Sequence, residues 1–573
     1  MTFLRRRVTS SAMSAFLCLT FGTAAHAATS WANTHTQAIS LVQATSLGTI
    51  NPTTQLRISV ALQMQNAAAL RTLVQQENTP GSPSYNTAIT PDQFNATYAP
   101  STASAAAVQN YLTQSGFTNV AVEPNRLFVT ATGSAAVVEA AFNTSLGLFS
   151  QNGKTVFVNT KAAQVPASLS GIVLSVLGLN NVQMAVHPTN KITPCNVSSP
   201  TCLRFTYDPA TYWKTYDVGT VPAASSATIA IMAEGNVSQA VTDLRAFEAG
   251  NHLPVVPVKI MQVGLASPDT AGVGEWDIDT QYSTGMAGSV KTLYIYTTTS
   301  LSDSDTALEL NHWAHDNLAK AANASFGICE FFPFLDGTMA ASDQVLLEAA
   351  AQGQTLFSST GDTGSFCPVG VGTNGVPAGA PFVNYPATST YAVGVGGTTL
   401  LSNADASYNG EVAWYAGGGG LSQFEGSPFW QQNVVPTNNP SVPATFRAIP
   451  DLSMDADPNT GAIIYMLNTT DGKSEPNCCW GGTSLASPLA VGVWARLQNA
   501  YGNRLGFAPP RLYAKYPAFG TAPTSTGTLT EPADGFHDIL TGANGFYTSL
   551  PYYDLTTGMG TFDVSAKKAV IPH

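Results

Sequence analysis

Hydrophobic positions between residues 57 and 160 switch repeatedly between the two-residue period of a strand and the 3.6-residue period of a helix. This pattern predicts strands at 57–64, 119–124, 126–133, 146–149 and 155–160, and helices at 65–78, 102–116 and 134–142. The mixture indicates a small α+β unit with an antiparallel sheet, of the ferredoxin-like kind. No group of residues within it suggests catalysis.

From residue 227 onward, apolar strands alternate with amphipathic helices. The expected strands are 227–235, 291–299, 323–328 and 355–362, the last ending in a loop, and the expected helices are 238–253, 305–322 and 340–353. This alternation predicts an α/β unit with a parallel sheet covered by helices on both faces. Active sites of such sheets lie beyond the carboxyl ends of the strands, and Asp362 follows a strand in this way.

The N-terminus has the form of a secretory signal. Three arginines precede an apolar run that ends in the A-x-A cleavage pattern of Ala25, His26 and Ala27. The run is too short to anchor the chain in a membrane, and no later stretch is long and apolar enough to span one. We therefore expect cleavage near Ala27 and secretion of a soluble protein.

A linker is expected at residues 187–202, which are rich in Pro, Ser, Thr and Asn and have no periodicity. With the α+β unit before it, the chain has the organisation of a precursor: a signal peptide at 1–27, an activation propeptide at 28–190 and a catalytic domain at 191–573. The alternative is an ordinary linker between two domains, which is commoner in general.

Charged residues make up only 10% of the 573-residue chain, against about a quarter in typical proteins. Removal of residues 1–27 takes away three arginines and no acid, which leaves 20 basic and 35 acidic residues and a formal net charge of −15. The absence of a basic cluster argues against binding to nucleic acid. Few carboxylates are present to be protonated as the pH falls, so tolerance of acid is expected.

Six cysteines lie outside the signal: Cys195, Cys202, Cys329, Cys367, Cys478 and Cys479. An even number in an exported chain indicates disulfides, although six cysteines allow fifteen pairings. A bond between Cys195 and Cys202 would close a local loop, whereas the adjacent Cys478 and Cys479 could each bond elsewhere or stay reduced. No C-x-x-C pattern suggests structural zinc.

Residues 481–488, GGTSLASP, have the pattern of an activated serine. Two glycines allow close approach of the backbone, and Ser484 then opens an apolar helical run whose free N–H groups favour nearby negative charge. A helix-capping serine is the simpler interpretation of the short motif Gly-Thr-Ser alone. The longer run is more specific, because Gly482, Thr483, Ser484 and Pro488 match the signature shared by subtilisins and sedolisins.

The base that would activate Ser484 is not a histidine in the subtilisin order, because no histidine lies between Asp362 and Ser484. Residues 362–365, DTGS, look like an aspartic protease motif, but such an enzyme needs two carboxyl groups that share a proton and the chain has one copy. Both of these mechanisms are therefore excluded.

A carboxyl pair in GVGEWDIDTQY, residues 272–282, can supply the base instead. On a helix, Glu275 and Asp279 stand one turn apart on the same face, whereas Asp277 points elsewhere. Like charges at this spacing repel, but two carboxyl groups that share one proton can act as a base and the group that orients it. The alternative is a solvated acidic helix start, since acids favour the first turn.

The ordered motifs GEWDID, SSTGD and GGTSLASP resemble the sedolisins, the serine-carboxyl peptidases of family S53. The resemblance implies a subtilisin-like parallel sheet covered by helices, preceded by a smaller ferredoxin-like α+β propeptide, and it covers nearly the whole chain after the signal. It further implies that Ser484 is the nucleophile, Glu275 the general base and acid, Asp279 the carboxylate behind it and Asp362 the oxyanion-hole acid. A carboxylate base keeps its function at lower pH than a histidine does, so the best activity is expected in acid.

The same resemblance implies a calcium ion in the segments 536–545 and 552–560. The ligands would be the side chains of Asp538 and Asp554 and the main-chain carbonyl groups of Ile539, Leu550 and Tyr552. Aspartates in loops rich in glycine and threonine suit a hard cation with oxygen ligands, although a pair of Asx turns would explain the segments taken alone. The family often has glycine where this chain has Leu550 and Tyr552.

Together these features predict a secreted, self-processing and acid-active endopeptidase that hydrolyses proteins and peptides as a monomer. Its own propeptide would act as an intramolecular inhibitor, and acid would protonate carboxylates at the contact and weaken it. Two other functions stay open. One is another serine hydrolase such as an esterase, although no G-x-S-x-G motif is present. The other is an exported binding protein that keeps a catalytically silent peptidase fold.

Overall fold

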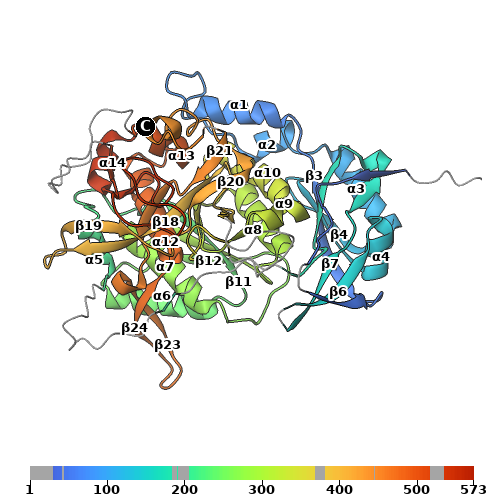
Figure 1. The fold of residues 1–573 in the computed structure, drawn as a ribbon, viewed down its shortest axis with the longest axis horizontal. Helices are drawn as coiled ribbons and strands as arrows, with labels where there is room; N and C mark the ends of the chain where they lie inside the picture. Colours follow the sequence, from blue (N-terminus) through green and yellow to red (C-terminus); the bar gives the residue numbers. More distant parts are fainter. Residues whose placement is uncertain are drawn as a thin grey trace, which may run out of the picture.

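The structure is a computed structural model of the chain, and it describes residues 30–41, 44–151, 153–182, 190–191, 206–367, 381–443, 445–516 and 534–573. An N-terminal α+β unit packs against one side of a larger α/β unit (Figure 1). The expected signal peptide, Cys195, Cys202 and most of the expected linker lie outside the described residues.

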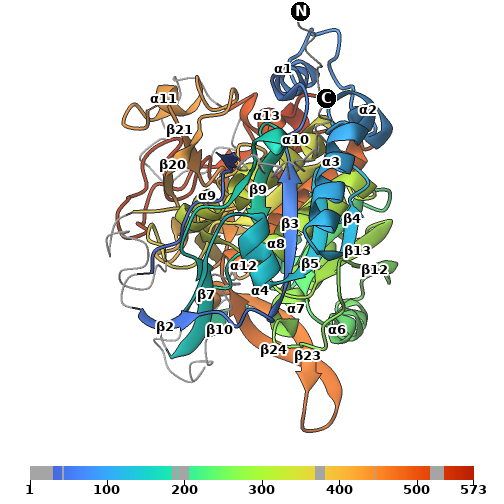
Figure 2. The same cartoon turned by 90° about the vertical axis from the view of Figure 1, so that its right-hand side faces the viewer.

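The N-terminal unit has a four-stranded antiparallel sheet in the order β4-β5-β3-β9. This is the strand order of a ferredoxin-like fold, as the sequence pattern predicts. The strands and the two helices on the outer face of the sheet (Figure 2) are β3 (Gln55–Leu62), β4 (Thr118–Val122), β5 (Phe128–Ser134), β9 (Val173–Leu177), α3 (Thr102–Gln114) and α4 (Ala135–Ala141). The unit also contains β1 (Trp31–Asn33), β2 (Thr45–Thr49), β6 (Leu146–Gln151), β7 (Lys154–Asn159), β8 (Gln164–Pro166), α1 (Ala67–Glu77) and α2 (Pro91–Thr97).

The larger unit is built on an eight-stranded sheet in the order β12-β13-β11-β14-β16-β18-β19, with β22 also paired to β18. All pairs are parallel except β18 with β19. The strands are β11 (Thr228–Glu234), β12 (Val258–Gln262), β13 (Thr292–Thr298), β14 (Ala321–Ala324), β16 (Thr355–Ser359), β18 (Ala392–Ser402), β19 (Tyr408–Ala413) and β22 (Leu452–Asp455). The main helices are α6 (Ser238–Gly250), α7 (Val273–Ala287), α8 (Asp303–Asp316), α10 (Thr338–Ala351) and α12 (Thr483–Ala500).

Shorter elements surround this sheet. The strands are β10 (Asn190–Lys191), β15 (Ile328–Cys329), β17 (Asn384–Tyr385), β20 (Gly420–Gly426), β21 (Phe446–Ile449), β23 (Ala462–Asn468), β24 (Lys473–Gly481), β25 (Phe536–His537) and β26 (Thr561–Phe562). The helices are α5 (Pro209–Thr215), α9 (Phe331–Asp336), α11 (Val435–Asn438), α13 (Ala508–Tyr513) and α14 (Val564–Val570). The hairpin of β23 and β24 projects from the lower edge of the molecule in Figure 1.

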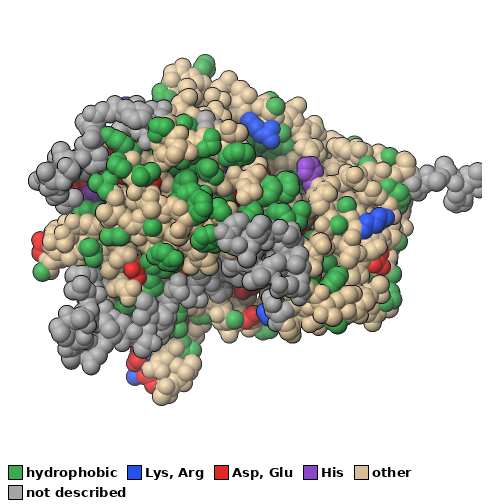
Figure 3. All heavy atoms as spheres, viewed as in Figure 1, with side chains coloured by type: hydrophobic (Ala, Val, Ile, Leu, Met, Phe, Trp, Pro, Cys, Tyr) green, Lys and Arg blue, Asp and Glu red, His purple; other side chains and the backbone are tan. Residues whose placement is uncertain are grey.

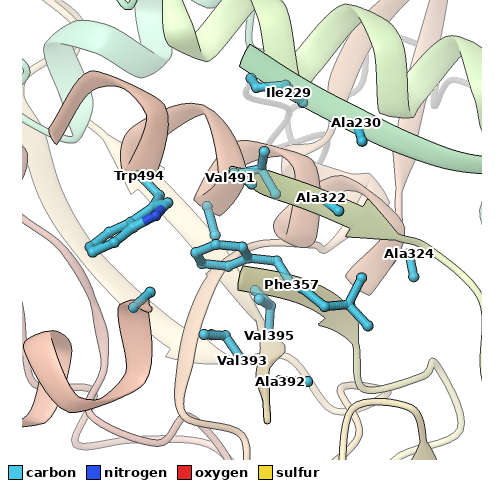
Figure 4. Close-up of a cluster of buried hydrophobic side chains, with 14 of the residues drawn as sticks. Ile229, Ala230, Ala322, Ala324, Phe357, Ala392, Val393, Val395, Val491 and Trp494 are labelled. Carbon is cyan, nitrogen blue, oxygen red and sulfur yellow. The ribbon is translucent and has the colours of Figure 1, made fainter. Parts of the chain in front are cut away.

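The central core lies between the sheet and α12, the helix that begins beside Ser484. Val491 and Trp494 of α12 point toward Phe357 of β16 (Figure 4), and the Phe357 and Trp494 rings lie 6.4 Å apart. Small alanines of β11 and β14 let the helix approach the sheet closely. Because α12 is buried along most of its length, the position of Ser484 is fixed by the core.

Both faces of the N-terminal sheet are buried, and the two faces belong to different cores. Val60 and Val129 pack with the sheet's own helices, whereas Ala61 and Phe128 pack with the core of the larger unit. Side chains alternate between the faces of a strand, so neighbouring residues serve the two cores in turn. The N-terminal unit is therefore fitted to the larger one.

Polar contacts across this interface include buried groups. Asn125 Nδ2 donates to Asn311 Oδ1 at 2.7 Å and to Glu348 Oε2 at 2.8 Å. Exposed and half-buried pairs also cross it: His312 Nε2 lies 3.1 Å from Glu123 Oε2, and Arg57 lies 3.8 Å from Asp305. The interface therefore combines buried hydrogen-bonded carboxyl groups with solvent-accessible ion pairs.

One predicted helix ends earlier than expected. The pattern over 305–322 predicts one continuous helix, but α8 ends at Asp316 and β14 takes up Ala321–Ala324. Asn317 caps α8 in the left-handed conformation, with φ 49°. The alanines that continue the helical pattern are needed instead as small residues under α12.

The cysteines give one expected outcome and one correction. Cys329 and Cys367 form a disulfide. Cys478 and Cys479 are bonded to each other, so the expectation that they bond elsewhere or stay reduced is wrong. The reason is local, because both cysteines lie within β24 at a point where its register against β23 shifts.

Charged side chains are sparse on the described part of the face shown in Figure 3, in line with the composition. On the face shown in Figure 3 they form scattered spots and no continuous patch. Within the described ranges, no helix combines the length and the apolar character needed to cross a membrane.

Candidate active site

Ser484 lies in the first turn of α12, where the chain leaves β24. Gly482 adopts φ 95°, a conformation that favours glycine. A Cβ atom at Gly481 would lie 2.4 Å from the Ala456 carbonyl oxygen, so this position needs glycine as well. The two glycines therefore allow the sharp turn and close approach that place Ser484, which is fully buried, at the start of the helix.

Glu275 and Asp279 lie one turn apart on α7, and both are fully buried. Burial raises the pKa of Glu275 well above its usual value, and the charge of Asp279 raises it further. Burial also raises the pKa of Asp279 well above its usual value. A pair with two raised pKa values retains a proton that one of the two carboxyl groups can lend to the other.

Glu275 faces Ser484, and this contact opposes the effects of burial and of Asp279 on the pKa of Glu275. The Ser484 hydroxyl group lowers the pKa of Glu275, but by less than burial and Asp279 raise it. Within the described part of the chain, Ser484 Oγ and both Glu275 oxygens lack a hydrogen bond of standard geometry. The two groups therefore face each other without a completed bond, as is common for catalytic groups before substrate binds.

Close packing of α7 against α12 holds Glu275 next to Ser484. A Cβ atom at Gly492 of α12 would lie 2.6 Å from the Cβ atom of Met286 on α7. A larger residue at Gly492 would push the helices apart and separate Glu275 from Ser484.

Three polar residues that no sequence motif singles out support Asp279. Ser325 Oγ donates to Asp279 Oδ1 at 2.6 Å, and Asn323 Nδ2 donates to Ser325 Oγ at 2.9 Å. Ser487 Oγ, one turn after Ser484, donates to Asn323 Oδ1 at 2.6 Å. The signal for them is weak: Asn323 lies among the alanines of β14, Ser325 directly follows that strand, and a serine stands three positions after Ser484.

Asp362 lies at the carboxyl end of β16 and contacts the residue before Ser484. Thr483 donates twice to Asp362 Oδ1, from its main-chain N–H and from its hydroxyl group, both at 2.8 Å. The Gly361 N–H in turn donates to Thr483 Oγ1 at 3.0 Å. The structure therefore brings Asp362 beside Ser484, close to the carboxyl pair on α7. The charge of Asp362 also raises the pKa of Glu275.

Asp277 points away from this site, as its position on the helix predicts. It is fully buried and interacts with Asp243 of α6, and burial followed by the charge of Asp243 raises its pKa well above the usual value. Asp243 Oδ1 also accepts a hydrogen bond from Gln239 Nε2 at 2.9 Å. This second carboxyl pair joins α6 to α7 and is separate from Ser484.

Comparison with known proteins identifies the family of this arrangement. Residues 43–182 match the family of the pro-kumamolisin activation domain, and residues 264–515 match the subtilase family. The chain is 36% identical to sedolisin of Pseudomonas sp. (strain 101), over 96% of this chain and 93% of that protein. The chain belongs to the sedolisin family.

Other relatives agree with this assignment. Xanthomonalisin of Xanthomonas sp. (strain T-22) is 34% identical to the chain over 94% of this sequence and 72% of its own. The solved structure of Pseudomonas sedolisin, a serine-carboxyl proteinase in complex with pseudo-iodotyrostatin, matches with a TM-score of 0.56 and 35% identity, over 64% of this chain and 98% of that one. This sedolisin-family chain is a serine-type peptidase with an activation propeptide and a subtilisin-like peptidase fold.

A second candidate site lies in the C-terminal loops, where the sequence predicts a cation. Asp538 Oδ2 accepts a hydrogen bond from the Tyr552 N–H at 2.7 Å, and Asp554 Oδ2 accepts one from the Leu550 N–H at 2.9 Å. Burial, with a further contribution from Asp554, raises the pKa of Asp538 to about 7. The loops therefore bring two carboxyl groups close together, next to the buried Ile539.

At Tyr552, where the family often has glycine, the backbone has a conformation that favours glycine. Tyr552 adopts φ 67°, in the left-handed region where glycine is favoured. The loop therefore keeps, with a tyrosine, the conformation that glycine would adopt more easily. The donors available, two carboxylates and main-chain carbonyl groups, fit a hard cation such as calcium.

Proposed function

We propose that this sedolisin-family protein is a secreted, acid-active endopeptidase that cleaves its own precursor, with Ser484 as nucleophile. Glu275 is the general base and acid, Asp279 orients it and shares its proton, and Asp362 stabilises the oxyanion. The observation that carries the proposal is the fully buried carboxyl pair of Glu275 and Asp279 facing Ser484. Burial of two like charges is costly, and a shared catalytic proton gives it a purpose.

In the first step, Ser484 Oγ attacks the carbonyl carbon of the peptide bond as its proton passes to Glu275. Asp279 keeps the shared proton near Glu275 and is itself held by Ser325. Glu275 then donates the proton to the leaving amine, which releases the C-terminal product. A water molecule repeats the sequence on the acyl-enzyme and frees Ser484.

Asp362 acts on the oxygen of the same carbonyl group. A neutral carboxyl group can donate a hydrogen bond to the developing oxyanion. The two bonds from Thr483 hold Oδ1, which orients the carboxyl group beside Ser484. This role requires Asp362 in its protonated form, which acid favours.

Self-processing is supported by the pairing of β10 with β24. Asn190 lies opposite Gly481 and Lys191 opposite Trp480, in antiparallel register. In this register, the N-terminal end of the bound strand points toward Ser484. From this pairing we infer that residues 190 and 191 occupy the position of the part of a substrate after the cleaved bond, and that the precursor is cut before Asn190.

We further propose a calcium ion bound by Asp538 and Asp554 with the carbonyl groups of Ile539, Leu550 and Tyr552. The ion would offset the charge of two buried carboxylates and tie both loops together. Chelation of calcium should lower the thermal midpoint of the Ser484→Ala protein, because a ligand that binds only the folded state stabilises it. Asp538→Asn should remove the difference between calcium and chelator, whereas Asp471→Asn, in an exposed turn, should keep it. Equal midpoints with and without chelator would contradict the site.

The catalytic proposal is tested by incubation of purified precursor at a series of pH values. Wild type should shorten itself and digest casein in acid, while Ser484→Ala and Glu275→Gln should lose activity by at least about a thousandfold. Asp277→Asn is the matched control on the same helix and should keep activity. Full activity of Glu275→Gln would exclude this mechanism, and hydrolysis of a short ester without casein would favour another serine hydrolase. A folded precursor that cleaves neither would be a silent peptidase-fold protein.

A further inference from the structure

The bond between Cys478 and Cys479 lies in a bulge of β24. Asn477 faces Ile464 of β23 and Trp480 faces Ala462, so the two cysteines stand opposite the single residue between those partners. Two residues against one is the arrangement of a β-bulge, which bends a strand and redirects the residues that follow. Here those residues are Trp480 and Gly481, the two that pair with β10.

The bulge contacts α7, the helix that carries Glu275, from both sides. The residue opposite the cysteines is Ile463, whose carbonyl group accepts a hydrogen bond from the Tyr282 hydroxyl group of α7 at 2.6 Å. After the bulge, the Trp480 ring packs on the start of α7, and a Cβ atom at Gly274 would lie 3.0 Å from it. The Trp480 indole N–H also donates to Asn477 Oδ1 at 3.1 Å, across the two cysteines.

We propose that the Cys478–Cys479 disulfide positions Trp480 and Gly481 to bind the part of a substrate after the cleaved bond, so that reduction weakens this binding selectively. This rests on the proposed function, because it takes Ser484 as the point of cleavage. Bonded sulfurs close a small ring that fixes the backbone of the bulge. Two thiols need a wider separation, so after reduction the ring opens and the register of Trp480 and Gly481 is no longer held.

The chemistry is that of ordinary thiol–disulfide exchange. A dithiol reductant supplies two electrons and two protons: the S–S bond breaks, two S–H groups form, and the reductant becomes a cyclic disulfide. Cys479 is buried and Cys478 is half-buried, so attack is expected at the sulfur of Cys478. An exported protein meets an oxidising environment, in which the bond persists.

The first test needs no enzymatic activity and uses the full precursor with Ser484→Ala, which does not process itself. Hydrogen exchange of the segment 477–483 should be slow in the oxidised protein and faster after dithiothreitol. Cys478→Ala/Cys479→Ala should exchange like the reduced protein and respond no further to dithiothreitol, while Cys329→Ala/Cys367→Ala should still respond. Unchanged exchange in this segment, or alkylation of Cys478 and Cys479 without reductant, would overturn the proposal.

The second test separates the two sides of the cleaved bond. One peptide carries several residues after that bond, and a matched substrate carries a chromogenic anilide there instead. Loss of the held backbone contacts should lower kcat/KM of Cys478→Ala/Cys479→Ala about tenfold on the peptide, with little change on the anilide. Equal loss on both would indicate a general structural role and overturn the proposal. If wild type cleaves neither substrate, the proposed function fails, while hydrogen exchange still decides whether the disulfide holds β24.

Discussion

Asp279 is the residue whose charge most directly tunes the base. Its negative charge raises the pKa of Glu275, so Asp279→Asn should lower that pKa and move the acid limb of the kcat/KM profile to lower pH. The rate should also fall, by about a hundredfold or more, because asparagine cannot share the proton. Asp277→Asn on the same helix should leave the acid limb in place, since Asp277 interacts with Asp243. An acid limb that stays fixed, or moves up, in Asp279→Asn would contradict this coupling.

At the same scale, the sequence reveals residues whose spacing carries chemistry and misses those that meet through the fold. Glu275 and Asp279 can be paired from the sequence because four residues make one helical turn. Ser325 and Asn323 support Asp279 from the end of β14 and the residue after it, and no local pattern links a strand end to a helix distant in sequence. The Cys478–Cys479 bond depends on a shift in strand register that the sequence does not encode in a readable form.

At the scale of the elements, Glu348 of α10 shows that acid can strengthen the contact with the propeptide as well as weaken it. Burial raises the pKa of Glu348 to about 8, against 4.5 when exposed. If removal of the propeptide exposes Glu348, the complex holds a proton between these values that the separated parts release, so this group strengthens the contact in acid and weakens it as the pH rises. Release of the propeptide in acid, as the sequence analysis expects, would have to come from other groups such as the Glu123–His312 pair.

Inhibition of the processed enzyme by its own propeptide, measured across pH, tests this balance. Glu348→Gln mimics the protonated carboxyl group and should give an inhibition constant that worsens less between pH 4.5 and about 8 than in wild type. Glu123→Gln, the matched control, removes an ion pair and should weaken inhibition most where that pair is charged. If Glu348→Gln leaves the pH dependence unchanged, its buried carboxyl group does not contribute to the contact.

The elements themselves follow from periodicity except where tertiary packing overrides it. The ferredoxin-like order of the N-terminal unit and the strands and helices around β11, β13 and β16 match their hydrophobic patterns. The helix expected through 305–322 stops at Asp316, and the alanines after it form β14. Alanine suits a helix, but it also suits a crowded strand beneath α12. Only the position of α12 over the sheet decides between these two uses.

For the molecule as a whole, buried carboxyl groups predict a fold that is most stable in acid. Burial raises the pKa of Glu330 and Glu411 to about 7 and of Glu77 to about 8, and raises that of Glu309 well above its usual value. Each group is protonated in both states below an unfolded pKa near 4.5. Above it only the folded state keeps the proton, so the free energy of unfolding falls as the pH rises through each folded value.

The thermal midpoint of the Ser484→Ala precursor should therefore fall from pH 4.5 toward pH 8, the interval that these groups span. Glu309→Gln should flatten the dependence of the thermal midpoint on pH, because the amide has the shape of the carboxyl group but no proton to lose as the pH rises. The amide oxygen can still accept the hydrogen bond that Glu309 Oε1 accepts from the Ala233 N–H at 2.8 Å. Scanning calorimetry at constant ionic strength and calcium concentration gives both curves. A midpoint that rises toward neutral pH would mean that ion pairs outweigh the buried acids. Acid, in which the active site is proposed to work, would then not stabilise the fold.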